Sequence, residues 1–405
     1  MDSAGEPESP EPAPEPAAGA PKWTVRRLGV LLAPALIYLA IREVGLMAVM
    51  WIGPQHGIRT TDALRSWDGQ WFLAIAGSGY DGVPAGLVDA FGRRSAETPL
   101  AFFPGYPTLV RWIAGVDGDG GIGLVTAALT VTVASGVACA YGLLRLGERI
   151  RGGSRRTGLI LVALFAATPM SIVLSMAYSE ALFCALAVWS LVGVLERRWL
   201  LAGICCTLAG LVRSTGAALV LAVVAAVVVA ALQRRATGRA GWRALVGGLV
   251  APLGLLGYLA WVGVRTGDWN GWFALQERGW DSGFDGGAAT LRFSLEALVD
   301  APSVLEVTTV GLIVVALALL VIGILRKVEW PLLVYAAAVL AMDLGSNGLM
   351  NSKLRLMIPA VTLLVPVALA LVKRRPSTAV LTCCALVAVG SWFGAYAITT
   401  WGYAI

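Results

Sequence analysis

The sequence predicts an all-α, polytopic membrane protein with about eleven transmembrane helices. Of its 405 residues, 58% are hydrophobic and only 14% are charged, whereas soluble proteins average roughly 45–50% apolar and about 25% charged residues. Apolar runs at 217–232, 244–264 and 304–325 approach or reach the ~20 residues with which a helix crosses a bilayer. Strands of a membrane barrel would instead be roughly 10 residues long and would alternate in polarity.

Two parts of the chain differ in composition. Residues 1–21 are rich in Pro, Glu and Ala without an apolar core, so we expect a disordered acidic tail. Residues 22–405 are expected to form one transmembrane domain, since no stretch between apolar runs is large enough for a separate soluble domain. The cysteines all lie in apolar runs without CxxC spacing, and His56 is the one histidine, so we expect neither disulfides nor a metal site.

The first apolar helix is expected at about 28–51, and it carries a charged pair, Arg42 and Glu43. Basic residues mark the cytoplasmic ends of membrane helices. Three of them precede this helix and place the N-terminus in the cytoplasm: Lys22, Arg26 and Arg27.

Ten further crossings are expected near 120–146, 158–178, 180–196, 199–213, 215–232, 244–264, 303–325, 330–345, 353–372 and 377–400. Lys and Arg gather in alternate connections between these helices, which by the same rule are cytoplasmic. The alternation requires 104–114 to lie on, or dip into, the outer surface as an interfacial or re-entrant helix. The net charge of +6 is therefore a marker of topology, and we expect no nucleic-acid partner. The outer connections include the long first loop and those near 176–181, 213–216, 265–302 and 346–355.

In the long first loop, Asp68 stands between Trp67 and Trp71 and directly before a glycine. A carboxylate among aromatic residues is partly desolvated, which suits a general base. The alternative is that Asp68 caps an interfacial helix and that the two tryptophans belong to the aromatic belt of the membrane.

Two further charged residues lie between apolar runs on the same side of the membrane. Glu180 begins a helix, where the helix dipole favours a negative charge, and the alternative is a buried carboxylate that faces a cavity. Arg213 lies on the side that is poor in basic residues. A phosphate-bearing ligand would explain it, because a guanidinium binds two phosphate oxygens at once. The alternatives are pairing with Glu180 or contact with lipid headgroups.

Lys353 and Arg355 open the tenth helix, where cations oppose the helix dipole. With the backbone amides there they would form a second anion site, and the alternative is contact with phospholipid headgroups.

The loop 265–280, which contains Trp269 and Gln276, is dense in aromatic, amide and charged groups. Such groups suit the stacking of sugars and the recognition of their hydroxyls, or else an interfacial amphipathic helix. No glycine-rich nucleotide loop is present, which disfavours a soluble nucleotide-sugar donor.

Five motifs follow one another along the chain. They are Trp67-Asp68-Gly69-Gln70-Trp71 with Gly79-Tyr80, Phe102-Phe103-Pro104-Gly105-Tyr106-Pro107, Tyr178-Ser179-Glu180-Ala181-Leu182-Phe183, Arg213-Ser214-Thr215-Gly216, and residues 352–359. In their order and spacing these motifs resemble the PIG-V type mannosyltransferases. That family is related to the second mannosyltransferase of GPI-anchor synthesis and belongs to the GT-C superfamily of multi-pass glycosyltransferases.

The resemblance implies a GT-C fold, a polyprenyl- or dolichyl-phosphate sugar as donor, and a catalytic carboxylate in the first outward loop. It marks Asp68 as the acid/base residue. From the residues and the resemblance together we expect catalytic roles for Asp68 and Glu180. We expect donor phosphate to bind Arg213, Lys353 and Arg355. We expect sugar or acceptor to contact Trp67, Trp71, Tyr106, Tyr178, Trp269 and Gln276.

The leading hypothesis is an inverting transfer of a hexose at the extracytoplasmic face of the plasma membrane. The resemblance implies that this hexose is mannose. Asp68 would deprotonate an acceptor hydroxyl of a lipid, glycan or protein while the cations stabilise the departing lipid phosphate. No cofactor is required by the pattern, and no ligand spacing argues for a divalent metal. The alternative hypothesis is a transporter or lipid flippase that uses Arg42, Glu43 and Glu180 as a polar relay.

Overall fold

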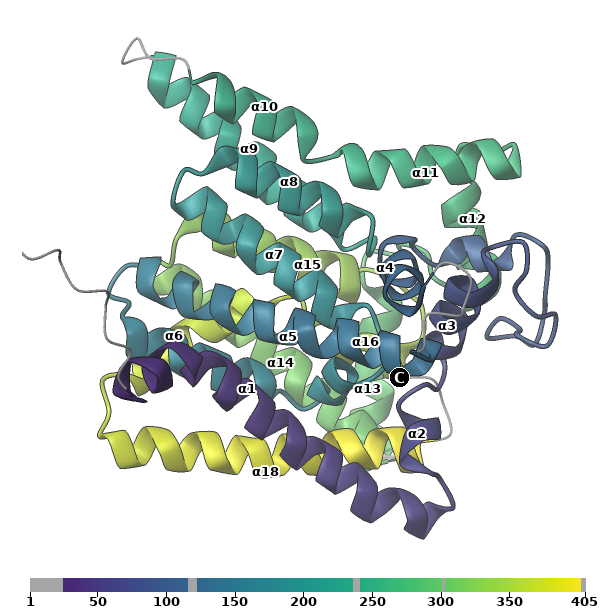
Figure 1. Cartoon of the computed structure of the whole chain (residues 1–405), viewed down its shortest axis with the longest axis horizontal. Helices are drawn as coiled ribbons and strands as arrows, with labels where there is room; N and C mark the ends of the chain where they lie inside the picture. Colours follow the sequence, from purple (N-terminus) through teal and green to yellow (C-terminus); the bar gives the residue numbers. More distant parts are fainter. Residues whose placement is uncertain (1–24, 116–121, 236–240, 301–302, 402–405) are drawn as a thin grey trace, which may run out of the picture. The chain divides into compact units, whose positions relative to one another are not determined.

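The computed structural model describes residues 25–115, 122–235, 241–300 and 303–401 (Figure 1). Helices joined by turns and loops make up this part of the chain, with one isolated β-bridge between Phe284 and Ser346. The chain divides into two units, Met1–Ala33 and Pro34–Ile405. In the first unit, residues 25–33 form the beginning of helix α1, and the predicted tail at 1–21 lies outside the described residues. The second unit contains the rest of α1 and all later helices.

Eighteen α-helices follow one another along the described residues, with five short 3-10 helices between them. The α-helices are α1 (Val25–Ile52), α2 (Thr60–Ala63), α3 (Asp68–Ser78), α4 (Gly105–Ala114), α5 (Leu124–Arg149), α6 (Arg155–Ala166), α7 (Glu180–Leu195), α8 (Trp199–Gly210), α9 (Gly216–Arg235), α10 (Trp242–Val250), α11 (Leu253–Thr266), α12 (Gly271–Trp280), α13 (Ala288–Asp300), α14 (Val304–Leu325), α15 (Trp330–Leu344), α16 (Lys353–Leu356), α17 (Val365–Leu371) and α18 (Pro376–Thr400). The 3-10 helices are η1 (Gly53–His56), η2 (Thr98–Ala101), η3 (Ser171–Ser175), η4 (Met350–Ser352) and η5 (Val361–Leu364).

Six helical segments in the described residues are long and apolar enough to cross a membrane, and a seventh is added if one bent pair counts as a span. The prediction of an all-α polytopic membrane fold is therefore confirmed, whereas eleven crossings are not shown. The six segments are Leu28–His56, Leu124–Arg149, Gly216–Gln233, Trp242–Thr266, Val304–Leu325 and Pro376–Thr400, and the bent pair is Met350–Leu356 with Val361–Leu371.

Several predicted crossings are shorter or more broken than expected. The apolar helices α7, α8 and α15 have 16, 12 and 15 residues, below the ~20 of a full crossing. The helix expected at 158–178 ends as α6 at Ala166, shortly before Pro169. The helix expected at 353–372 is interrupted around Pro359, and its two pieces meet at 68°. Proline lacks the backbone N–H that a helix interior needs and disfavours helical geometry in the residue before it.

Helices α5, α7 and α8 lie side by side in succession, and α6 packs against α5 (Figure 1). Small residues allow these close approaches, as is common between membrane helices. A Cβ atom added to Gly147 of α5 would lie 2.3 Å from the Cα atom of Gly158 in α6. Glycine is therefore required for this helix pair to meet at its observed distance.

Contacts join three of the connections that are rich in basic residues. Glu196, which caps the C-terminal end of α7, has its Oε1 atom 2.6 Å from the Nε atoms of both Arg145 and Arg149. The backbone N–H of Arg151 donates to Glu329 Oε1 at 2.6 Å. The connections after α5, α7 and α14 thus lie together, in agreement with the alternation of basic residues along the chain.

Candidate active site

A cavity of about 200 Å³ lies beside the N-terminal end of α7. Its walls come from segments far apart in the sequence: the start of α3, residues 101–103, the turn before α9, helix α12, and residues 346–356. Five residues singled out in the sequence line it: Asp68, Arg213, Gln276, Lys353 and Arg355. Tertiary structure has therefore brought the first loop, the 213–216 turn, the 265–302 connection and the 346–355 turn to one place.

Asp68 is the first residue of α3, and the residue before it has an unusual backbone conformation. Trp67 has φ 51° and ψ −117°, a region that favours glycine because it brings the side chain close to the backbone. Such a conformation costs about 1–3 kcal/mol and persists only where its surroundings enforce it. The side chain of Trp67 packs against the main hydrophobic core, which leaves Asp68 directed toward the cavity.

Two hydrogen bonds attach this part of the first loop to the segment that precedes α7. The backbone N–H of Ala177 donates to Leu64 O at 2.8 Å, and the Tyr178 hydroxyl donates to Ser66 O at 3.2 Å. Tyr178 is fully buried. It therefore helps to fix the start of α3 relative to the start of α7 and is not among the residues that line the cavity.

Four charged side chains alternate in sign beside the cavity. Arg355 Nη1 lies 2.7 Å from Asp68 Oδ2, and its Nε lies 3.5 Å from Glu180 Oε1. Glu180 Oε1 in turn lies 2.7 Å from Arg213 Nη1. The Arg355 guanidinium also stands over the ring of Tyr178, 5.3 Å from its centroid, a cation–π arrangement. The pairing of Arg213 with Glu180, one of the two alternatives considered for this arginine, is therefore present together with its position on the cavity wall.

This charged cluster is largely withdrawn from solvent. Glu180 is fully buried, and the Arg355 side chain is only 9% exposed. Among the described residues, neither Glu180 oxygen nor Arg355 Nε has a partner in hydrogen-bonding geometry. Nε of Arg355 is buried and faces Glu180, while Nη1 bonds to Asp68. Arg355 also lines the cavity, where a guanidinium is suited to an anionic oxygen.

Lys353 is placed differently from the two arginines. Its ammonium donates to the backbone carbonyl oxygens of Asp343 and Ser346 and to the Ser346 hydroxyl, which matches the three protons that it carries. Helix α16 has only four residues, so the helix-start anion site expected here lacks the long helix that would give it a strong dipole. Lys353 lines the cavity, but its bonds mainly hold the turn that follows α15.

Asp343 is a carboxylate that sequence reasoning missed. It is buried near the end of α15, and both of its carboxyl oxygens lack a hydrogen-bond partner among the described residues. Its position within an apolar segment was the available signal, since acidic residues inside membrane helices are rare and commonly functional. Among the described residues no group of three or more His, Cys, Asp or Glu side chains is arranged to hold a metal ion.

Helix α12 forms an aromatic and amide wall of the cavity. Trp272, Gln276 and Trp280 all line it, because residues four apart lie on the same face of a helix. Gln276 Nε2 donates to Ala101 O at 3.0 Å, and Trp272 Nε1 donates to the same oxygen at 3.3 Å. The two tryptophans would have been found by applying helical spacing to this loop. Three phenylalanines complete the apolar wall: Phe72, Phe102 and Phe103.

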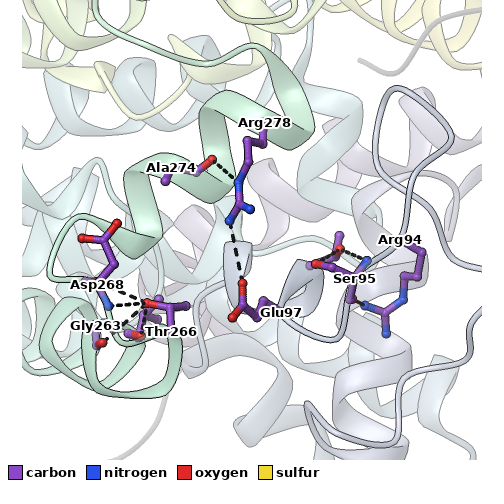
Figure 2. Close-up of polar contacts among 10 residues, drawn as sticks. Arg94, Ser95, Glu97, Gly263, Thr266, Asp268, Ala274 and Arg278 are labelled. Atoms are coloured by element: carbon purple, nitrogen blue, oxygen red, sulfur yellow. Dashed lines mark hydrogen bonds and ion pairs between the residues drawn. The ribbon is translucent and has the colours of Figure 1, made fainter.

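Further polar contacts fix α12 against the first loop (Figure 2). Figure 2 shows Arg278 reaching from α12 toward Glu97, with the two side chains 3.7 Å apart, while its Nε donates to Ala274 O at 3.2 Å. In the turn between α11 and α12, the backbone N–H of Asp268 donates to the Thr266 hydroxyl at 3.4 Å. Part of this loop therefore forms a helix, Gly271–Trp280, and one of its faces lines the cavity.

Five aromatic residues expected to contact sugar or acceptor do not line the cavity: Tyr178, described above, and four others. Trp71 is buried and stacks on Phe102, with ring centroids 5.1 Å apart, so it supports a lining residue from behind. Tyr106 is fully buried, and its hydroxyl is 3.0 Å from that of Thr132, which gives it a place in the packing between α4 and α5. Trp269 is 79% exposed and lies outside the lining, as does Trp67.

The charged pair of the first helix is divided between two environments. Arg42 is buried and donates to Ser175 Oγ at 2.9 Å, Ser171 Oγ at 2.6 Å and Ala166 O at 2.7 Å. Glu43 is exposed. Within the described residues, no contact joins these two side chains to each other or to Glu180, as a polar relay for transport would need.

Comparison with known proteins shows a similarity of fold but no similarity of sequence at the family level. No described protein family matches the chain, and no curated protein matches its sequence. Among solved structures, ArnT from Cupriavidus metallidurans bound to undecaprenyl phosphate superposes with a TM-score of 0.51 at 16% identity, over 93% of this chain and 70% of ArnT. The oligosaccharyltransferase of Archaeoglobus fulgidus, in complex with Zn and sulfate, gives a TM-score of 0.48 at 16% identity, over 91% of this chain and 53% of that protein. The chain therefore has a fold similar to that of ArnT.

Proposed function

We propose that this protein is a membrane glycosyltransferase of the GT-C type that moves a sugar from a polyprenyl-phosphate donor to an acceptor hydroxyl. The observation that carries the proposal is the meeting of Asp68, Glu180, Arg213 and Arg355 around one cavity with aromatic and amide walls. Carboxylate, guanidinium and aromatic groups are the three kinds that such a transfer needs. The ArnT structure with a similar fold is bound to undecaprenyl phosphate, which supports a donor of this lipid class.

In the proposed reaction, Asp68 accepts the proton of the acceptor hydroxyl while that oxygen attacks the anomeric carbon. The bond from that carbon to the phosphate oxygen breaks, and its electron pair leaves with the lipid phosphate. Negative charge thus moves from the Asp68 carboxylate to the phosphate. Arg355, which lies 2.7 Å from Asp68 and lines the cavity, is placed to stabilise the charge at both ends of this movement.

Arg213 and Glu180 have supporting parts in the same mechanism. Arg213 lines the cavity and offers a second guanidinium to the phosphate. Glu180 touches both arginines and holds them at fixed positions, so we assign it a positioning role beside the base. Lys353 holds the turn after α15 and contributes its positive charge at longer range.

Finer assignments follow from the motifs that resemble the PIG-V type mannosyltransferases. We propose mannose as the sugar, an acceptor that is a lipid, glycan or protein, and a cavity that opens at the outer face of the plasma membrane. A single displacement by the acceptor would invert the anomeric centre. Trp272, Gln276 and Trp280 are the residues that we expect to contact the sugar, since stacking and amide bonding suit its faces and hydroxyls.

The test is transfer of labelled mannose from polyprenyl-phosphate mannose into the acceptors of native membranes that contain the protein. We expect Asp68→Asn to lower the rate about 10²-fold to 10⁴-fold, the usual contribution of a general base. Asp62→Asn is a matched control, because Asp62 lies in the same loop and pairs only with surface arginines among the described residues. Wild-type rates in Asp68→Asn, or equal losses in the two variants, would contradict the role of Asp68.

A further inference from the structure

Glu43 is an exposed carboxylate within a membrane span. It belongs to the segment Leu28–His56, and no hydrogen bond or ion pair joins its side chain to another described residue. It lies eight residues before Trp51, or about 12 Å along the axis at ~1.5 Å per residue. Trp51 is 70% exposed, as is typical of a tryptophan at the membrane–water interface. Glu43 therefore lies inside the apolar layer.

The neighbouring arginine does not neutralise this carboxylate. Arg42 points into the protein, where two serine hydroxyls and a backbone carbonyl accept its N–H groups. Successive residues of a helix are turned by about 100°, so Glu43 faces outward when Arg42 faces inward. A charged side chain that faces lipid is costly, and those found within membrane spans almost always have a partner.

The surface around Glu43 is otherwise apolar and offers room for another helix. Exposed residues follow one another at intervals of three or four along α1, which is the spacing of a single helix face. They are Leu36, Ala40, Glu43, Met47 and Met50. Beside this face, α1 and α18 enclose a groove of about 390 Å³ that begins at the residue after Glu43. Its lining is Val44, Met47, Ala48, Trp51, Ile52, Ala388, Ser391 and Trp392.

We propose that this face of α1 binds a transmembrane helix of a different protein that carries a lysine or arginine at the depth of Glu43. Charge complementarity selects this occupant, because a cation inside the bilayer neutralises the carboxylate that the apolar groove leaves unpaired. A second copy of this chain would bring two Glu43 side chains together across a two-fold axis, and like charges in contact oppose that arrangement. An acyl chain would fill the groove without pairing with the carboxylate.

The test uses the full chain in proteoliposomes and two designed transmembrane peptides as probes. Both peptides are Leu/Ala helices, and one has a single lysine at the depth of Glu43 while the other has leucine there. Energy transfer between labelled chain and labelled peptide reports binding. We expect the wild-type chain to bind the lysine peptide at least ~10-fold more tightly, since a paired charge inside a membrane replaces an unpaired one. Glu43→Gln should abolish that preference, and Met47→Leu, which keeps the apolar surface, should retain it.

A stability measurement separates this interface from an ordinary structural role. Without a partner, Glu43→Leu should raise the midpoint of thermal unfolding of the isolated chain, because it removes an unpaired charge from the apolar layer. The same variant should lose the preference for the lysine peptide. Equal binding of both peptides by the wild type, or an unchanged preference in Glu43→Gln, would overturn the proposal. Self-association of the wild-type chain that depends on Glu43 would overturn it in favour of a second copy. None of these measurements depends on sugar transfer.

Discussion

Helix α7 has a glutamate at each end, and the arginines that pair with the two glutamates differ in how far they are exposed. Glu180 at the N-terminal end is fully buried and contacts Arg213 and Arg355 beside the cavity. Glu196 at the C-terminal end contacts three arginines: Arg145 and Arg149, each at 2.6 Å, and Arg198 at 3.8 Å. The difference is in the partners: the Arg145 side chain is 39% exposed, whereas that of Arg355 is 9% exposed.

The same pair of residue types can thus serve two purposes. Ion pairs with exposed arginines contribute only about 0–1 kcal/mol each, because water already solvates the charges. Loss of one partner from a buried pair costs roughly 3–5 kcal/mol, because the remaining charge stays desolvated. We therefore expect the Glu196 cluster to join the ends of helices and the Glu180 cluster to hold charges in place for a ligand.

The largest expected contrast is between Arg355→Gln and Arg145→Gln. Arg355→Gln leaves the Asp68 and Glu180 carboxylates without a shared cation, so we expect sugar transfer to fall about 10²-fold to 10³-fold and the protein to lose roughly 3–5 kcal/mol of stability. In Arg145→Gln, Arg149 still pairs with Glu196, and both quantities should stay near wild type. Transfer rates and thermal unfolding in one membrane system measure the two. Similar losses in both variants would remove the distinction between the clusters.

Next in size is the contrast between Glu180→Gln and Glu196→Gln. Glu180→Gln removes the group that positions both arginines, so we expect kcat to fall about 10-fold to 100-fold. KM for the donor should not rise, since the loss of a negative charge does not weaken the attraction of a phosphate. Glu196→Gln should change neither constant. A rise in donor KM with unchanged kcat in Glu180→Gln would argue against the positioning role.

A smaller effect is expected for Lys353→Met. The substitution leaves the carbonyl oxygens of Asp343 and Ser346 without their donor, which costs about 1–3 kcal/mol per buried unpaired group. The main result should be a lower midpoint of thermal unfolding, with a smaller fall in transfer rate than in Arg355→Gln. Were Lys353→Met to match Arg355→Gln in rate while unfolding normally, Lys353 would be a direct phosphate ligand.

The smallest expected effect comes from the backbone conformation of Trp67, as distinct from the packing of its side chain. Both Trp67→Gly and Trp67→Ala remove the packing of the ring, but only glycine adopts φ 51° without strain. We expect the glycine variant to be more stable than the alanine variant by about 1 kcal/mol, the reverse of the usual order. Its transfer rate should also be the higher of the two, because Asp68 keeps its position. Equal stability of the two variants would show that the strained backbone matters little.

Much of the fold could be predicted because its causes are local. Long apolar runs predicted the helices at 124–149, 304–325 and 376–400 to within a few residues. The prediction was wrong where a proline interrupts a continuous apolar run, as at Pro359. Hydropathy measures only how apolar a residue is, so it does not reveal that proline lacks the backbone N–H of a helix interior. The predicted count of eleven crossings included such broken segments, together with apolar helices that are too short to span a bilayer.

The charged residues of the candidate site could be predicted from the sequence, whereas the aromatic residues that line it were harder to predict. Asp68, Arg213 and Arg355 drew attention as polar residues beside apolar runs, and all three line one cavity. Tyr106 and Trp269 were selected as aromatic residues in polar loops, yet the first is packed in the interior and the second is exposed outside the cavity. The direction of a ring depends on the packing of several helices, which a single segment does not specify.

The sequence by itself determined that this chain is a helical membrane protein whose Lys and Arg residues gather in alternate connections between the helices. Bilayer thickness sets the length of each apolar segment, and basic residues mark the end of each segment, so both can be recognised one segment at a time. Tertiary structure alone decided which charges meet. Ion pairs join Asp68 to Arg355, and Glu180 to both Arg355 and Arg213, while Glu43 is left facing outward. The physical reason is that burial and pairing are properties of helices in contact, and the sequence of one helix does not specify its neighbours.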